Sequence, residues 1–163
     1  MEFIDTKAEM ELMKIIYKTG DLLEAPERVI CHGCNAQGKM GAGIAVPIRK
    51  RYPKAFDDYR ALYEAQGNRL ELGQCVFVEC PEDRIVIDAV TQAFYGREPD
   101  VVYTSYDGIR RALQQINDWA KVNGVDTVAF PKIGAGLAKG DWSIIEGIIE
   151  TESTNFQPVV YEL

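Results

Sequence analysis

The chain has 163 residues, of which 47% are apolar, and its net charge at neutral pH is −7. This length and apolar content fit a single domain over residues 1–163, and no linker-like or highly charged segment divides the chain. The acidic balance argues against a nucleic-acid-binding surface, and no apolar run reaches the roughly 20 residues of a membrane-spanning helix.

The N-terminus and the cysteines point to an intracellular protein. Residues 1–5 are acidic, whereas a secretion signal begins with basic residues and continues with an apolar stretch. The cysteines are too few, and too deep within strand-like segments, for a secreted disulfide framework. We therefore expect a soluble, cytoplasmic monomer with reduced thiols that binds neither nucleic acid nor membranes.

The first half of the chain predicts two strands and a long helix. An N-terminal extension of residues 1–12 precedes a strand expected at residues 13–18, and a second strand is expected at residues 28–31. Apolar and aromatic residues then recur at three- and four-residue spacing over residues 42–65. This spacing predicts a helix, which Pro53 should kink or split.

The second half of the chain alternates predicted strands with predicted helices. A turn at residues 81–83 permits an antiparallel pair, and Gly124 should close a helix as a left-handed cap. The expected elements are strands at 74–80 and 84–90, a helix at 106–122, a strand at 127–130, a helix at 141–150 and a strand at 159–161. This alternation predicts an α/β fold with a mixed sheet, whose ligands bind beyond the carboxyl ends of the strands.

Two glycine-rich segments run from an expected strand toward an expected helix. The first glycine loop spans residues 30–45 and the second glycine loop spans residues 128–142. Backbone N–H groups of such loops, together with a helix N-terminus, attract anions. The glycine spacing matches neither the Walker nor the Rossmann pattern. Two such loops predict one ligand with more than one phosphate, and the alternative is a pair of tight turns without a ligand.

Two residues are candidates for catalysis at such a phosphate. His32 is the only histidine of the chain and is expected at the end of a strand beside the first glycine loop, where it could transfer a proton. The alternative is a packed or solvated bystander. Asp141 precedes Trp142 at an expected helix start, a pattern typical of an N-cap, and its catalytic role is the lesser interpretation.

Three further motifs have a functional and a plain interpretation. Cys31 and Cys34 resemble half of a zinc or redox site, but no second pair completes it, so no metal and no cofactor are expected. Asp21 could accept a hydrogen bond from an adenine amino group, or simply form a turn. The aromatic residues of Phe94-Tyr95-Gly96 could cover a ribose or base, although packing into the core is the favoured interpretation.

The first glycine loop resembles a macrodomain signature. Its residues His32-x-Cys34-Asn35-x-x-Gly38-x-x-Gly41-x-Gly43-Ile44-Ala45 are followed by Arg51-Tyr52-Pro53-Lys54-Ala55. The resemblance extends from Gly20-Asp21-Leu22 to Ile133-Gly134-Ala135-Gly136-Leu137 and the C-terminal residues, and it is strongest to the ADP-ribose 1″-phosphate phosphatases. It implies a three-layer α/β/α domain that binds ADP-ribose in a cleft over the sheet.

The resemblance also implies roles for individual residues. Asp21 and Leu22, next to Gly20, would meet the adenine, and Asn35 would approach the distal ribose. The residues expected around the phosphates are Gly41, Ala42, Gly43, Ile44 and Ala45 in the first loop, and Gly134, Ala135, Gly136 and Leu137 in the second.

Three activities follow from this resemblance. The leading hypothesis is hydrolysis of ADP-ribose 1″-phosphate to ADP-ribose and phosphate, with His32 as the proton donor or nucleophile and Asp141 orienting water. The alternatives are a non-catalytic ADP-ribose reader and an ADP-ribosyl hydrolase. Similar hydrolases use a lysine and an aspartate at positions that match Gln92 and Ala138 here. A lysine adduct is therefore disfavoured, unless Lys139 or Asp141 compensates.

Overall fold

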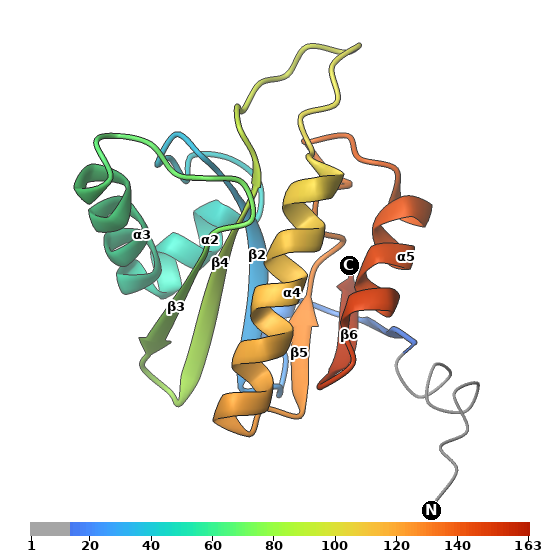
Figure 1. Cartoon of the computed structure of the whole chain (residues 1–163). Coiled ribbons are helices and arrows are strands. Elements are labelled where there is room, and N and C mark those ends of the chain that lie inside the picture. Colours follow the sequence, from blue (N-terminus) through green and yellow to red (C-terminus); the bar gives the residue numbers. More distant parts are fainter. Residues whose placement is uncertain (1–13) are drawn as a thin grey trace, which may run out of the picture.

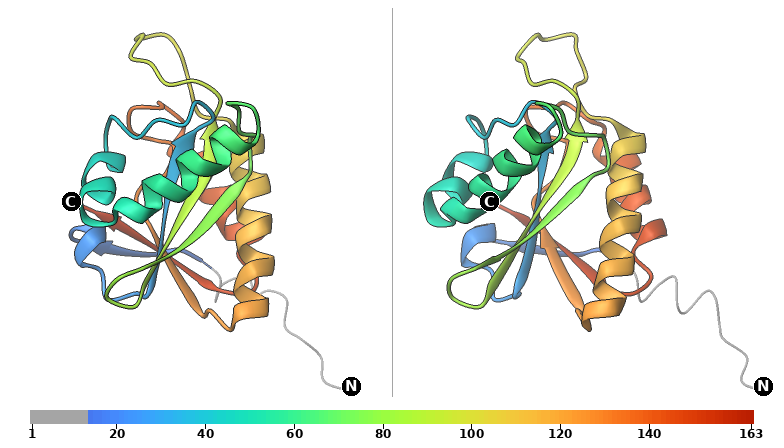
Figure 2. Two further views of the ribbon diagram at one scale, coloured as in Figure 1. Left: turned by 90° about the vertical axis from the view of Figure 1, so that its left-hand side faces the viewer. Right: turned by 60° about the vertical axis from the view of Figure 1, so that its left-hand side comes forward.

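The computed structural model describes residues 14–163 as a six-stranded sheet with helices on both faces (Figures 1 and 2). The N-terminal extension expected at residues 1–12 lies outside the described residues, as does Met13. The strands are β1 (Ile16–Thr19), β2 (Val29–Asn35), β3 (Cys75–Cys80), β4 (Arg84–Gln92), β5 (Thr127–Phe130) and β6 (Gln157–Glu162). The helices are α2 (Ala45–Arg51), α3 (Pro53–Ala65), α4 (Tyr106–Asn123) and α5 (Trp142–Glu152), with a 3₁₀ turn η1 (Leu22–Glu24) after β1. The expected three-layer α/β/α fold with a mixed sheet is confirmed.

The strand order places five carboxyl ends at one edge of the sheet. The order is β1-β6-β5-β2-β4-β3, and all neighbours are parallel except β3, which is antiparallel to β4. Glu82 and Asp83 adopt positive φ angles of 65° and 55° in the turn that joins β3 to β4. The loops that follow β1, β5, β2 and β4 therefore share one edge, where ligands of parallel sheets bind.

Each face of the sheet has its own apolar core, because neighbouring strand residues point to opposite sides. Cys31 and Ile87 pack with Leu113 of α4 and Ile145 of α5 on one face. On the other face, Ile30 belongs to the cluster that includes residues of α2 and α3. Among residues 14–163, no helix is both long enough and apolar enough to span a membrane.

Local sequence signals mark where three helices begin or end. The expected split at Pro53 is confirmed: α2 ends at Arg51, and Pro53 starts α3, where its missing N–H costs no helical hydrogen bond. Gly124 closes α4 with a φ of 64°, as expected for a left-handed cap. Ser105 starts the same helix, and its side chain accepts a hydrogen bond from the N–H of Gly108.

Strand β2 is longer than the expected strand at residues 28–31. It continues to Asn35, because residues 32–35 pair in parallel with β4. Gly33 suits this position, since a Cβ there would lie 2.6 Å from Oγ1 of Thr91. The first part of the first glycine loop is therefore a strand inside the sheet, and this moves His32 away from the position that we expected.

Candidate functional site

A cavity of about 530 Å³ lies at the carboxyl edge of β2, β4 and β5, between the two glycine loops. The predicted binding residues that line it are Asn35, Gly41, Ala42, Gly43, Ile44, Ala45, Gly134, Gly136 and Leu137. Both glycine loops thus border one cavity, as the two-loop hypothesis requires. Ala135 is not among the lining residues.

Asn35 shapes the turn that follows β2. Its Nδ2 donates to the carbonyl of Lys39 over 2.8 Å, and its Oδ1 accepts from the N–H groups of Gln37 and Lys39 over 3.0 and 3.2 Å. The Tyr59 hydroxyl donates to the Asn35 carbonyl over 2.5 Å. Gly38 has a φ of 73°, and a Cβ there would lie 2.7 Å from the Tyr63 ring. Contact between Asn35 and a ribose stays a prediction.

The second glycine loop is fixed by hydrogen bonds around Gly134. The Thr104 hydroxyl and the N–H of Gly140 both donate to the Gly134 carbonyl, over 2.5 and 2.7 Å. Gly134 has a φ of 78°, which favours glycine. The loop leads into α5, where the Asp141 carboxylate accepts from the N–H of Ser143 over 2.9 Å.

The N-cap interpretation of Asp141 is therefore confirmed. Hydrogen bonds from the Ser143 hydroxyl and N–H hold the pKa of the Asp141 carboxyl below its usual value. Asp141 is exposed and does not line the cavity. Its catalytic role stays a prediction, and the position of its side chain gives that role no support.

The charged residues of the cavity wall are all cations. Lys39, Arg97 and Lys132 line it, whereas no Asp or Glu of residues 14–163 does. Lys132 forms an ion pair with Glu162 at 2.9 Å. In a chain of net charge −7, this arrangement makes the cavity a local site for an anion.

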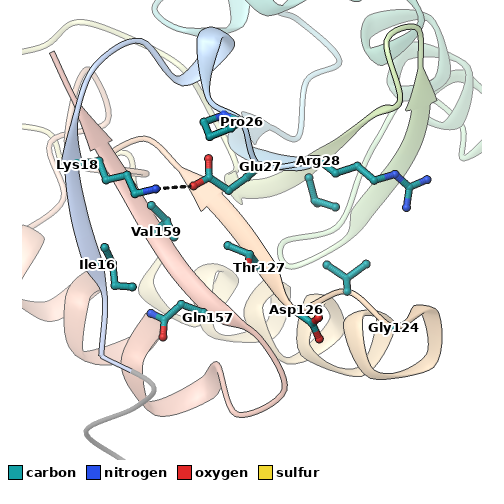
Figure 3. A pocket seen from close by; sticks show the side chains of 12 residues that line it. Ile16, Lys18, Pro26, Glu27, Arg28, Gly124, Asp126, Thr127, Gln157 and Val159 are labelled. Carbon is teal, nitrogen blue, oxygen red and sulfur yellow. Dashed lines mark hydrogen bonds and ion pairs between the residues drawn. The ribbon is translucent and has the colours of Figure 1, made fainter.

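A second cavity of about 540 Å³ lies at the opposite edge of the sheet, near the amino ends of β2, β5 and β6 (Figure 3). Its wall mixes both signs of charge: Lys18 and Arg28 lie beside Glu27 and Asp126. Lys18 and Glu27 already pair at 3.2 Å. Since parallel sheets bind ligands at their carboxyl ends, the first cavity is the better candidate.

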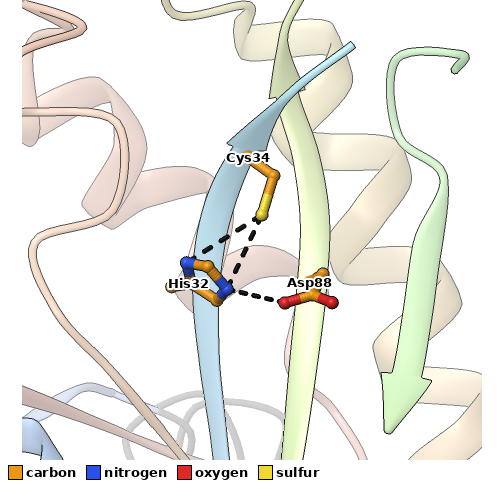
Figure 4. Close-up of side chains that lie close together, drawn as sticks. All are labelled: His32, Cys34 and Asp88. Atoms are coloured by element: carbon orange, nitrogen blue, oxygen red, sulfur yellow. Dashed lines mark hydrogen bonds and ion pairs between the residues drawn. The ribbon is translucent and has the colours of Figure 1, made fainter. Parts of the chain in front are cut away.

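His32 does not lie at the edge of the cavity, so its expected position is wrong. It sits within β2, completely buried, and its Nε2 lies 2.6 Å from Oδ1 of Asp88, which is also completely buried (Figure 4). Burial raises the pKa of the Asp88 carboxyl, and the contact with His32 lowers it in part. His32 does not line the cavity, so the geometry points to a structural contact between two buried polar side chains.

Cys31 and Cys34 do not form half of a metal site. Cys31 packs in the core beneath α4 and α5, whereas Cys34 belongs to the cluster with Tyr59 of α3, on the other face of the sheet. Cys34 does lie near His32 and Asp88, with donor atoms within 4.8 Å of one another. His32 and Asp88 already contact each other, and burial raises the pKa of the Cys34 thiol well above its usual value, which favours the neutral thiol.

The expected adenine contacts lie at the same edge of the sheet but do not line the cavity. Gly20 follows β1, and its N–H donates to the Glu162 carbonyl at the end of β6 over 2.7 Å. Asp21 caps η1 by accepting from the N–H of Leu23 over 3.0 Å, and Leu22 is buried. Leu22 packs in the cluster that includes Ala129 of β5 and Ile48 of α2, beside the elements that border the cavity. Their role in adenine binding stays a prediction.

The loop between β4 and α4 supplies cavity residues that the sequence did not single out, among them Arg97. Tyr95 lines the cavity, and Phe94 is 66% exposed, so the favoured interpretation of these aromatics as core residues is wrong. Gln92 and Ala138, at the positions that resemble the hydrolase lysine and aspartate, both line the cavity. The wall thus has neither an amine nor a carboxylate at these positions.

A family model and several known proteins match this chain. The Macro domain family model matches residues 31–149. The chain is 30% identical to an uncharacterized 17.5 kDa protein of Enterobacteria phage T4, over 92% of this chain and 97% of that one. It is 28% identical to an ADP-ribose 1″-phosphate phosphatase of Candida albicans, over 83% and 92%. It is 26% identical to the ADP-ribose glycohydrolase OARD1 of Bos taurus, over 95% of each.

A solved structure shares the fold of this chain. A Bacteroides thetaiotaomicron protein of unknown function superimposes with a TM-score of 0.81 at 28% identity, over 93% of this chain and 99% of that one. The fold, the paired glycine loops and the family match agree. The chain belongs to the Macro domain family.

Proposed function

We propose that this protein binds ADP-ribose 1″-phosphate in the cavity between the glycine loops and hydrolyses its terminal phosphate ester. The observation that carries the proposal is the composition of the cavity wall. The wall contains both glycine loops and three cations, and no carboxylate of residues 14–163 lines it. The similarity to the Candida albicans phosphatase names the substrate class. The cytoplasmic location and the monomeric state expected from the sequence stay predictions.

The order of the strands suggests how the substrate lies. Asp21 follows β1, the second glycine loop follows β5, the first leads out of β2, and Arg97 follows β4. With about 4.8 Å between strands, β1 and β4 are about 19 Å apart across this edge. An adenine near Asp21 would place the pyrophosphate between the glycine loops and the terminal phosphate near the end of β4.

The chemistry of phosphate monoester hydrolysis suits such a wall. The transition state is loose, and catalysis depends mainly on positioning and on stabilising charge on the equatorial oxygens. Backbone N–H groups of the glycine loops and the cations Lys39 and Arg97 would supply this stabilisation. Because His32 is buried, and burial raises the pKa of the Cys34 thiol well above its usual value, direct attack by water is favoured over a covalent intermediate.

The ADP-ribosyl hydrolase alternative has less support, although one relative carries a glycohydrolase name. The Gln92 amide is not nucleophilic, and its Nε2 donates to the carbonyl of Phe94 over 2.8 Å. Lys139 does not replace the missing amine, because its ammonium group donates to the carbonyl of Glu98 over 2.5 Å. A non-catalytic ADP-ribose reader would use the same cavity.

Release of inorganic phosphate from ADP-ribose 1″-phosphate tests the proposal, with calorimetric titration of ADP-ribose as a parallel measurement. We expect phosphate release with and without a chelator, and binding of ADP-ribose as the product. Binding without phosphate release would reject the phosphatase in favour of the reader. Release of ADP-ribose from modified protein, without phosphatase activity, would favour the hydrolase.

A further inference from the structure

Arg97 is a cation of the cavity wall without a carboxylate partner. It lines the cavity, and no Asp or Glu of residues 14–163 lies within the 4.0 Å of an ion pair. The other two cations of the wall have contacts: Lys132 pairs with Glu162, and the Lys39 ammonium donates to the Tyr95 hydroxyl over 3.3 Å. Arg97 is thus the wall cation most available to an anionic ligand.

The loop that carries Arg97 is fastened on both sides of this residue. It rises above the carboxyl edge of the sheet between β4 and α4 (Figure 1). Before Arg97, the N–H of Tyr95 donates to Oε1 of Gln37 in the first glycine loop over 3.1 Å. After Arg97, the Glu98 carbonyl accepts from Lys139 of the second glycine loop over 2.5 Å. The backbone on both sides of Arg97 is therefore fastened to the glycine loops that border the cavity.

The strand order assigns Arg97 to one end of the ligand. Its loop follows β4, on the far side of the glycine loops from Asp21 and β1. If the adenine lies near Asp21, as the proposed function has it, the group nearest β4 is the one attached to the distal ribose. In the proposed substrate that group is the terminal phosphate.

We propose that Arg97 is the specificity-determining cation that distinguishes ADP-ribose 1″-phosphate from ADP-ribose. A phosphate monoester carries nearly two negative charges at neutral pH, whereas ADP-ribose ends in a neutral hydroxyl at the same carbon. A guanidinium group binds phosphate oxygens through two parallel hydrogen bonds. Arg97 therefore strengthens binding of the substrate and contributes little to binding of the product. The inference rests on the proposed function, because the phosphatase substrate defines this end of the ligand.

The test compares Arg97→Gln with the matched control Arg69→Gln, which removes an exposed arginine outside the cavity wall. Phosphate release gives kcat/KM for ADP-ribose 1″-phosphate, and calorimetry gives Kd for ADP-ribose. We expect Arg97→Gln to lower kcat/KM about tenfold and to change Kd for ADP-ribose less than twofold. Arg69→Gln should change neither. Because the Arg97 side chain is exposed, the loss should shrink as salt screens the charge.

The outcomes separate this inference from the proposed function. A similar loss for both ligands, or no loss for the substrate, would overturn the role of Arg97 while phosphatase activity stands. If the wild-type protein releases no phosphate, the proposed function fails. Calorimetric titration of ADP-ribose 1″-phosphate then replaces the measurement of kcat/KM. Arg97 then keeps its role only if Arg97→Gln weakens binding of this ligand about tenfold and leaves binding of ADP-ribose unchanged.

Discussion

Replacing His32 with alanine should destabilise the protein without removing a catalytic group. The substitution leaves the Asp88 carboxylate completely buried and without its contact at Oδ1, and Oδ2 has no hydrogen-bond partner in the structure. Leaving a buried carboxylate without its partner costs about 3–5 kcal/mol. For a domain of this size we expect a fall in Tm of about 6–20 °C.

The pH dependence of this variant follows from the burial of Asp88. Burial raises the pKa of this carboxyl in the folded protein, and His32 lowers it in part, so loss of His32 raises it further. A raised folded-state pKa gives stability that is present at pH values below the unfolded pKa of about 3.9 and is lost as the pH rises through the folded pKa. The difference in the free energy of unfolding between His32→Ala and the wild type should therefore be largest near neutral pH and smaller in acid.

Urea unfolding and phosphate release per folded molecule, measured on the same samples, test this reasoning. His32→Ala should lower the midpoint of unfolding, and adding Asp88→Asn should recover part of the loss, because the unpaired charge is gone. The folded fraction should retain kcat within about threefold. If His32→Ala folds as stably as the wild type but releases no phosphate, the structural role of His32 is refuted. That result would support a catalytic role for His32 instead.

Two further predictions concern the cavity itself. Leu137→Asp places a carboxylate beside the expected pyrophosphate: at about 6 Å and an effective dielectric constant of about 40–80, two phosphate charges repel it by about 1.4–2.8 kcal/mol. Calorimetry should show that Leu137→Asp binds ADP-ribose about ten- to hundredfold more weakly than the wild type. The control Val122→Asp changes a more exposed residue outside the cavity wall and should bind normally. Equal affinity in both variants would count against the cavity as the binding site. Gly134→Ala should weaken binding and lower Tm, because φ is 78° and the new Cβ would lie 3.0 Å from Oγ1 of Thr104. Gly136→Ala, with nothing within 4 Å of its Cβ, should leave Tm unchanged, and equal Tm values for the two alanine variants would contradict this account.

Local signals in the sequence predicted most of the elements. Pro53 separated α2 from α3, Gly124 closed α4, and Asp141 capped α5, because each acts on the backbone within a few residues of itself. The alternation of strands and helices was enough to predict a sheet covered on both faces. The two glycine loops then indicated the edge of the sheet at which the cavity lies.

The features that the sequence did not predict depend on distant contacts. β2 continues through His32 because β4 lies beside it, and no local pattern distinguishes a paired glycine-containing strand from a loop. Arg97 is far along the chain from both glycine loops, and only the folded sheet brings its loop to them. A cationic cavity in an acidic chain is likewise a property of tertiary structure, which net charge conceals.

A crystal structure with bound ADP-ribose would test the central claim most directly. We predict that the pyrophosphate lies between residues 41–45 and residues 134–137, with the adenine toward Asp21 and the distal ribose toward the loop of Arg97. A ligand bound at the opposite edge of the sheet, in the cavity beside Lys18 and Arg28, would contradict the claim. So would a nucleotide in the reverse orientation, with its adenine beside Arg97.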